Sequence, residues 1–167
     1  MTIIGRLSLN DVLMRGVVAG AAGGLAEIAW VSVYASLTGG DAAIIARGVT
    51  TAVGVNALLP SASVAMGIAV HMALAVLLGL PIVALWQTVG RRFGLGAGYA
   101  AVLAALAGVW AFNFFVALPA ISPAFITMLP YAVSLTSKLL FGLAAAETLR
   151  RFTVAGAPVP VPAQARR

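Results

Sequence analysis

The sequence has no cysteine, and this absence removes several kinds of chemistry at once. Disulfides, thiol nucleophiles, Cys-ligated zinc and iron–sulfur clusters all need a sulfur ligand that the chain does not have. Histidine is nearly absent too, because His71 is the single imidazole in 167 residues. No spacing of residues suggests a metal site, and no Ser-His-Asp set can be assembled at one depth. We therefore expect neither a metal centre nor an enzyme.

Charged residues are also scarce. They make up 8% of the chain against 62% hydrophobic residues, and the mean hydropathy is +1.09. A soluble domain needs roughly a quarter of its residues charged to cover its surface. The composition therefore excludes a soluble enzyme and predicts an integral membrane protein in contact with the lipid bilayer.

Four apolar runs are long enough to cross a bilayer, which takes about 20 helical residues. They cover residues 16–38, 62–86, 97–118 and 124–148. The runs are continuous and rich in Ala and Leu, whereas strands would alternate. The sequence predicts an all-α, polytopic integral membrane protein with four transmembrane helices. A short turn at residues 120–123 would make the third and fourth helices a tight hairpin.

The segment between the first two spans, residues 41–60, has a different pattern. Asp41 is a plausible helix N-cap, and Arg47, Thr50 and Thr51 recur at helical spacing opposite an apolar face. We expect a short helix that lies in the membrane interface. A re-entrant hairpin is the alternative, and it would need a buried partner for Arg47.

The positions of the arginines predict the orientation. With four crossings, only Arg47 falls on one side, and the other side holds Arg6, Arg15, Arg91, Arg92, Arg150, Arg151, Arg166 and Arg167. Because basic residues favour the cytoplasmic side, both termini should be cytoplasmic in a multi-pass protein of the inner (plasma) membrane. The net charge of +6 is then explained by arginines that orient the helices in the membrane, and we expect no nucleic-acid partner.

The chain divides into two parts by composition. Residues 1–153 hold all four spans and form the predicted transmembrane domain. Residues 154–167 are rich in proline and read as a cytoplasmic tail without a core of its own.

Two oppositely charged residues lie inside the spans, where a charge costs about 2.5–3.5 kcal/mol on insertion scales. Glu27 is twelve residues after Arg15, and Lys138 is twelve residues before Arg150. At the helical rise of 1.5 Å per residue, both lie about 18 Å from the cytoplasmic boundary. We predict that Glu27 and Lys138 form an ion pair between the first and fourth helices.

A second polar level is expected about one turn further out. His71 and Asn113 both lie near 22 Å by the same estimate, so we expect a contact between them. Tyr131 and Ser134 share one helical stripe with Lys138 and complete a predicted intramembrane polar cluster. Haem ligation is the alternative role for His71, but one histidine excludes a bis-His site within the chain. We expect no cofactor.

Small residues recur at every fourth position on two helices. Gly16, Gly20 and Gly24 form a ridge on the first span, and Gly67 and Gly79 belong to a ridge around His71 on the second. Such ridges allow close helix packing, either within the chain or between chains.

Two functions fit these features. The first is a small non-enzymatic accessory or assembly subunit of a larger membrane complex, because the glycine ridge of the first span suits a membrane protein partner. The second is a small transporter or proton-conducting protein in which Glu27, His71 and Lys138 line a polar path, formed as a homo-oligomer because four helices leave little room for a cavity. A third interpretation of the ion pair is purely structural, since buried pairs fix helix register without catalysing anything.

Overall fold

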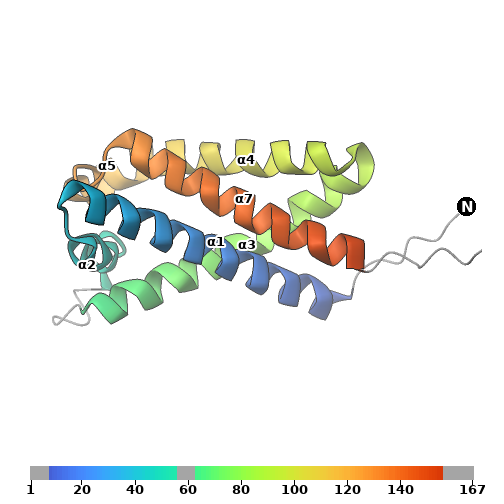
Figure 1. Ribbon diagram of the computed structural model, residues 1–167, viewed down its shortest axis with the longest axis horizontal. Coiled ribbons are helices and arrows are strands. Elements are labelled where there is room, and N and C mark those ends of the chain that lie inside the picture. Colours follow the sequence, from blue (N-terminus) through green and yellow to red (C-terminus); the bar gives the residue numbers. More distant parts are fainter. Residues whose placement is uncertain (1–7, 56–62, 156–167) are drawn as a thin grey trace, which may run out of the picture.

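The computed structural model describes residues 8–55 and 63–155, and every regular element in these ranges is helical. Four helices are long and apolar enough to cross a membrane, as the sequence predicts. They are α1 (Leu9–Thr38), α3 (Val64–Phe93), the continuous helix Leu95–Ile121, and α7 (Tyr131–Ala155). Figure 1 shows them as one elongated bundle. Helix α1 packs against α3 and α7, and the helix from Leu95 packs against the same two.

The first two spans are longer than the hydropathy pattern indicates. Helix α1 starts at Leu9 because Ser8 and Asp11 form a capping box, in which the Ser8 hydroxyl accepts from the Asp11 N–H at 3.1 Å. Helix α3 is capped by Ser63 and continues past Trp86 to Phe93. The polar residues at these ends therefore belong to helical turns that extend beyond the apolar part of each span.

The third span does not stop at Pro119. Helix α4 (Leu95–Phe112) passes through a π-helical turn, η2 (Asn113–Ala117), into α5 (Leu118–Ile121). In η2 the Leu118 N–H bonds to the carbonyl of Asn113, five residues earlier. A proline removes an N–H from the ordinary helical ladder, and the wider turn just before Pro119 accommodates that loss.

The fourth span begins later than expected, so the connection is not a tight turn at residues 120–123. A short helix, α6 (Pro123–Ile126), and a turn precede α7, which begins at Tyr131 directly after Pro130. The Pro130 carbonyl accepts from the Ser134 N–H at 3.0 Å, which places this proline at the cap of α7. Helix α7 extends to Ala155, two residues into the predicted tail, and residues 156–167 lie outside the described residues.

The predicted short helix is α2 (Ala42–Ala52). Asp41 is its N-cap, and its carboxylate accepts from the Ala43 N–H at 2.8 Å. Helix α2 crosses α3 where Gly67 faces the backbone of Ala46, and Figure 1 shows it at the same end of the bundle as α5. Arg47 is exposed and lies 3.8 Å from Asp41, and no described residue is a buried partner of the kind that a re-entrant hairpin requires. The rest of that predicted segment, from residue 56, is outside the described residues.

The glycine ridges are used within the chain. A Cβ at Gly20 would meet the Ala75 carbonyl, and a Cβ at Gly79 would meet the backbones of Gly16 and Gly20. At Gly24 it would lie 2.7 Å from the Ala75 Cβ. Gly16, Gly20, Gly24 and Gly79 therefore form the α1–α3 contact, and Gly67 packs against α2. The sequence left open whether these ridges make contacts within the chain or between chains.

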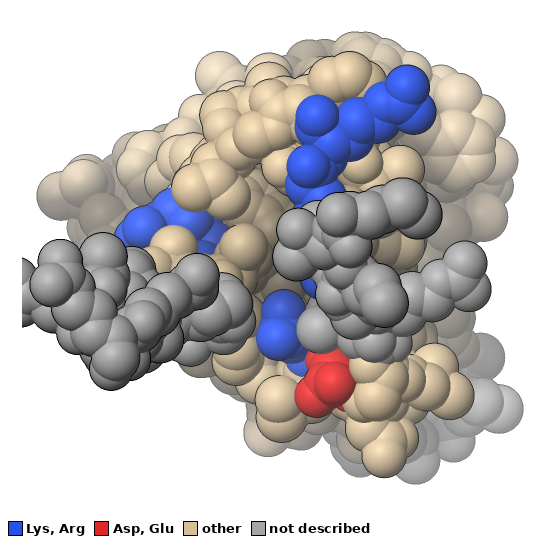
Figure 2. Space-filling model, turned by 90° about the vertical axis from the view of Figure 1, so that its right-hand side faces the viewer, with Lys and Arg blue, Asp and Glu red and all other residues tan. Residues whose placement is uncertain are grey.

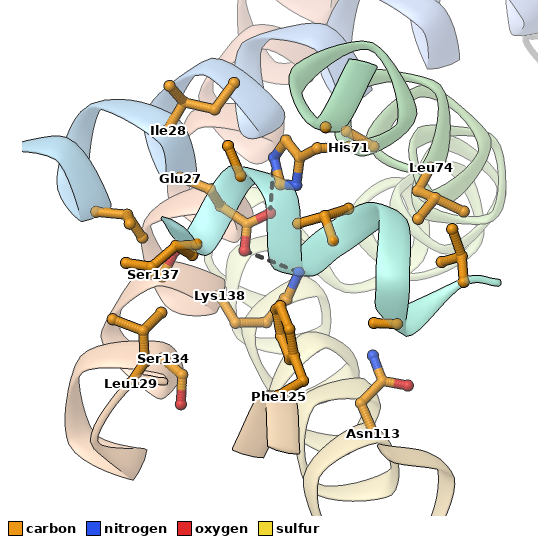
Figure 3. A pocket seen from close by; sticks show the side chains of 18 of the residues that line it. Glu27, Ile28, His71, Leu74, Asn113, Phe125, Leu129, Ser134, Ser137 and Lys138 are labelled. Carbon is orange, nitrogen blue, oxygen red and sulfur yellow. Dashed lines mark ion pairs between the residues drawn. The ribbon is translucent and has the colours of Figure 1, made fainter. Parts of the chain in front are cut away.

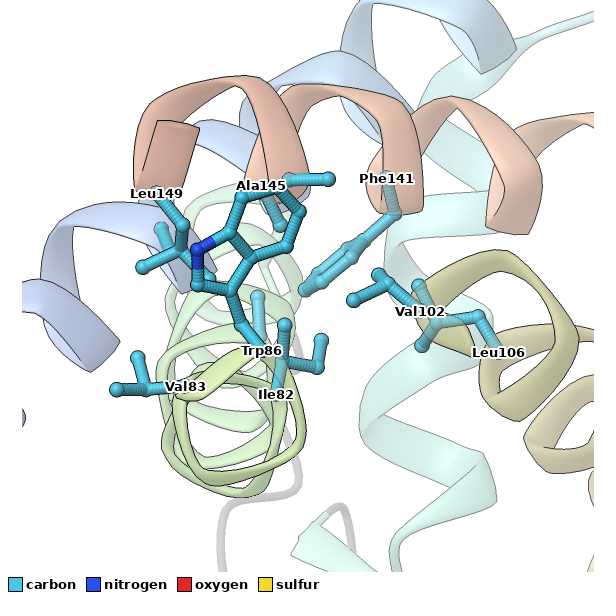
Figure 4. Close-up of a cluster of buried hydrophobic side chains, with 11 residues drawn as sticks. Ile82, Val83, Trp86, Val102, Leu106, Phe141, Ala145 and Leu149 are labelled. Carbon is cyan, nitrogen blue, oxygen red and sulfur yellow. The ribbon is translucent and has the colours of Figure 1, made fainter. Parts of the chain in front are cut away.

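The well-packed core lies in the half of the bundle away from α2. Figure 4 shows side chains of α3, α4 and α7 that meet there, and the largest fully buried ones are Phe141, Leu106, Leu149, Val83 and Val102. Trp86 closes this cluster, and its indole N–H donates to the Thr153 hydroxyl at 3.3 Å.

The described arginines near the helix ends gather at one end of the bundle. Helix α1 begins at this end, α3 meets α4 there and α7 ends there (Figure 1). Figure 2 looks onto this end and shows several Lys and Arg side chains on it. The residues concerned are Arg15, Arg91, Arg92, Arg150 and Arg151. We call this the arginine end.

Candidate functional site

The predicted ion pair between Glu27 and Lys138 is present. Lys138 Nζ lies 2.8 Å from Glu27 Oε1, which links α7 to α1 (Figure 3). The Glu27 side chain is only 7% exposed and that of Lys138 is 18% exposed. Lys138 Nζ also lies 5.3 Å from the centre of the Phe141 ring, within cation–π range. Both charges are thus shielded, and each has a defined neighbour.

His71 joins this pair from α3. Its Nε2 lies 3.7 Å from the second carboxylate oxygen of Glu27 and 3.3 Å from the carbonyl of Gly24. The imidazole donates to the Gly24 carbonyl when Nε2 carries the proton. One carboxylate therefore faces Lys138 with one oxygen and His71 with the other. We call these three residues the polar triad.

The expected contact between His71 and Asn113 is not formed. No hydrogen bond joins them in the described part of the chain, because His71 is turned towards α1. Figure 3 shows Asn113 on the opposite side of the site. Helical rise gives the depth of a residue but not the direction in which its side chain points, and packing of α3 on α1 decides that direction.

A partly open cavity of about 620 Å³ borders the polar triad. We call it the chamber. Residues from every helix of the described chain line it, and α2 forms one wall. Most of the lining is apolar, and its polar members are Glu27, Ser32, His71, Asn113, Ser134, Ser137 and Lys138. Sequence patterns did not reveal the chamber, because it exists only where six separate segments meet.

Asn113 reaches the chamber from the π-helical turn η2. Its side-chain amide makes no hydrogen bond within the described residues, although the amide carries both donors and an acceptor. Turns of this kind are rare and frequently lie at functional sites. Within the described residues, the amide is therefore a polar group of the chamber wall that has no hydrogen-bond partner.

Ser134 and Tyr131 have supporting roles. The Ser134 hydroxyl accepts from the Trp110 indole N–H at 3.0 Å and donates to the Tyr131 carbonyl at 3.1 Å. The Tyr131 ring packs against Trp110, Phe114 and Phe115. Ser134 thus lines the chamber and fixes Trp110, whereas Tyr131 belongs to an aromatic cluster beside it.

Phe141 separates the chamber from the core. Its ring is fully buried, contacts the backbone position of Gly23 and lies one turn after Lys138 on α7. It lines the chamber and also belongs to the buried cluster of the other half of the bundle. The bundle is therefore hollow on the α2 side of Phe141 and filled on the arginine side.

A second charged group lies at the arginine end and was missed by the sequence interpretation. The Tyr99 hydroxyl donates to Glu147 at 2.6 Å, and Glu147 also pairs with Arg150 and Arg151 at 2.7 and 2.8 Å. The spacing of three and four residues between Glu147 and the two arginines predicts such pairs on a helix. The tyrosine partner comes from α4 and has no signal in the sequence.

The site offers an ion pair, an imidazole, one free amide and apolar walls. No group of three His, Asp or Glu side chains suited to a metal ion occurs among residues 8–55 and 63–155. Comparisons of this chain with protein-family models, with curated proteins and with solved structures give no match.

Proposed function

We propose that this chain is a multi-pass integral membrane protein, with both termini in the cytoplasm, that transports a small molecule through the chamber. One observation carries the proposal: the polar triad lies on the wall of a cavity of about 620 Å³. A pair that served only to fix helix register would be best enclosed in packed side chains, because water and ligands weaken it. Here a cavity lies beside Glu27 and Lys138, the two residues whose charges are unfavourable inside a membrane.

The chamber has the properties of a small-molecule site. Its volume is within the roughly 300–1,000 Å³ of typical ligand pockets, which are mostly apolar with a few placed polar groups. Transporters commonly place such sites at depth in the bilayer, next to interrupted helices. In this chain Asn113 lies on a π-helical turn within a continuous helix, where the regular hydrogen-bond pattern of the helix changes.

The packing also suggests how passage would be controlled. The chamber lies on the α2 side of Phe141, and the buried cluster fills the bundle from Phe141 to the arginine end. This arrangement would correspond to one state of an alternating-access cycle, with the chamber in the α2 half of the bundle and the path towards the arginines closed. Transport requires a second state in which contacts around Phe141 separate.

Cysteine labelling tests this proposal directly, because the chain contains no cysteine of its own. The Asn113→Cys variant is placed in membrane vesicles of either orientation and treated with a membrane-impermeant methanethiosulfonate reagent. A transporter exposes this position in turn to both sides, so we expect labelling from both. Leu77→Cys, an exposed position on α3 that does not line the chamber and faces lipid in a membrane, is the matched control and should stay unlabelled from either side.

Two results would contradict transport. Labelling of Asn113→Cys from the α2 side alone would indicate a pocket that does not change its accessibility. Absence of labelling from both sides would indicate that the chamber is closed to water and that the Glu27–Lys138 pair is structural. If labelling occurs from both sides, the functional test is the flux of an identified solute into proteoliposomes. Glu27→Gln should abolish this flux.

A role as an accessory subunit is the second candidate. The outer surface of the third span favours it, because only 11% of its most apolar window is buried inside the chain, against 39% for the fourth span. A membrane protein partner or a second copy of this chain would cover that surface, as lipid would in a monomer. Native mass spectrometry of the solubilised protein decides between these cases: a lone monomer would exclude a stable partner.

A further inference from the structure

We infer that the ligand of the chamber is an uncharged amphipathic molecule, with an apolar body and a hydrogen-bonding group at one end, and that Asn113 recognises this group. The inference rests on the proposed function and names its substrate class. It follows from three observations on the chamber wall: its charge balance, its apolar area and the free amide of Asn113.

The charges of the chamber compensate each other. Among the described residues, Glu27 and Lys138 are the only Asp, Glu, Lys or Arg residues in the lining, and they are paired at 2.8 Å. A carboxylate ligand would have to take Lys138 from Glu27 and leave that carboxylate buried without its ammonium partner. An ammonium ligand would do the same to Lys138. Both exchanges leave a shielded charge uncompensated, which proteins avoid.

The remaining surface suits an apolar body. Leu, Ile, Val, Ala and Phe side chains make up most of the lining on both sides of the polar triad. Ser134 is a poor candidate for a ligand contact because its hydroxyl already bonds Trp110 and the Tyr131 carbonyl. Ser32 and Ser137 lie on α1 and α7, the helices of the Glu27–Lys138 pair, whereas Asn113 lies on a separate helix. A ligand made mainly of polar groups, such as a sugar, would leave its groups unpaired here.

Asn113 is the polar group best placed to select the ligand. Its amide borders the chamber and has no hydrogen-bond partner within residues 8–55 and 63–155. An amide both donates and accepts, so it can pair with a hydroxyl or a carbonyl without a change of charge. Figure 3 shows Asn113 apart from Glu27 and His71, with the Lys138 side chain between them.

Three probes with one chain length and different heads test this inference: 1-octanol, octanoate and octylammonium. The protein carries Ser32→Cys, which lines the chamber on α1, and is reconstituted into lipid nanodiscs. Protection of this cysteine from a methanethiosulfonate reagent is measured as a function of the mole fraction of each probe in the bilayer. We expect half-protection by octanol at a mole fraction at least tenfold lower than by either ion.

The role of Asn113 is tested on the same background. Asn113→Leu keeps the side-chain size and removes the amide, and it should weaken protection by octanol at least fivefold. Val116→Leu, an exposed position on the same turn, is the matched control and should change nothing. An unchanged octanol response in a folded Asn113→Leu protein would overturn the role of this amide.

The ranking of the three probes needs no variant at Asn113 and keeps the inference falsifiable if Asn113→Leu fails to fold. Equal or better protection by octanoate or octylammonium would overturn it, as would no protection by any probe. Transport is judged separately by the two-sided labelling of Asn113→Cys, so the two proposals can fail independently.

Discussion

The ion pair between Glu27 and Lys138 allows the sharpest quantitative prediction, because both partners are shielded and each is approached by one further group. Removing one partner of a buried pair costs about 3–5 kcal/mol, since the other charge remains without compensation. Lys138 is 18% exposed and borders the chamber, so we take the lower limit. Glu27→Gln and Lys138→Met should each lower the free energy of unfolding by about 3 kcal/mol.

The double variant should be no worse than either single variant. With Glu27→Gln and Lys138→Met together, no uncompensated charge remains, so the total loss should not exceed about 3 kcal/mol. The coupling free energy of the double-mutant cycle is then at least about 3 kcal/mol in magnitude, well above the roughly 0.5 kcal/mol of independent sites. Reversible unfolding by sodium dodecyl sulfate in mixed micelles, followed by circular dichroism, measures all four proteins. Two results would refute a stabilising ion pair between Glu27 and Lys138. One is a loss of unfolding free energy in the double variant equal to the sum of the single losses, and the other is a single loss under about 0.5 kcal/mol.

Two further predictions concern the packing around the site. Gly20→Ala places a methyl group against the Ala75 carbonyl and 2.8 Å from the Val76 Cα, so it should destabilise the protein by about 1–3 kcal/mol. Gly108→Ala, which meets nothing within 4 Å, is its control and should not destabilise. Ser134→Ala removes the acceptor of the Trp110 indole and should cost about 1–2 kcal/mol in the same assay. Ser36→Ala, at an exposed helix position, should stay within about 0.5 kcal/mol, and equal effects of the two serine variants would contradict the assigned hydrogen bond.

The helical type and the number of the long elements could be predicted from the sequence alone. Continuous apolar runs of sufficient length give four helices, and Asp41 marks the start of α2. The ends of the helices were less predictable, because capping by Ser8 and the π-helical turn before Pro119 add polar or irregular turns to an apolar run. The late start of α7 has the same cause, since Pro130 fixes a cap within a sequence that is apolar on both sides.

The sequence alone determined the positions of the charged residues along their helices, because each helical residue advances by a fixed rise and arginines mark the ends. This was enough to pair Glu27 with Lys138. Only the tertiary structure decided which way side chains point and what lies beside them. Close approach of α1 and α3 through their glycines turns His71 towards Glu27, and Asn113 is left across a chamber that the crossing of α2 helps to form. Depth is a property of each helix by itself, whereas direction and empty space depend on contacts between helices that are distant in the sequence.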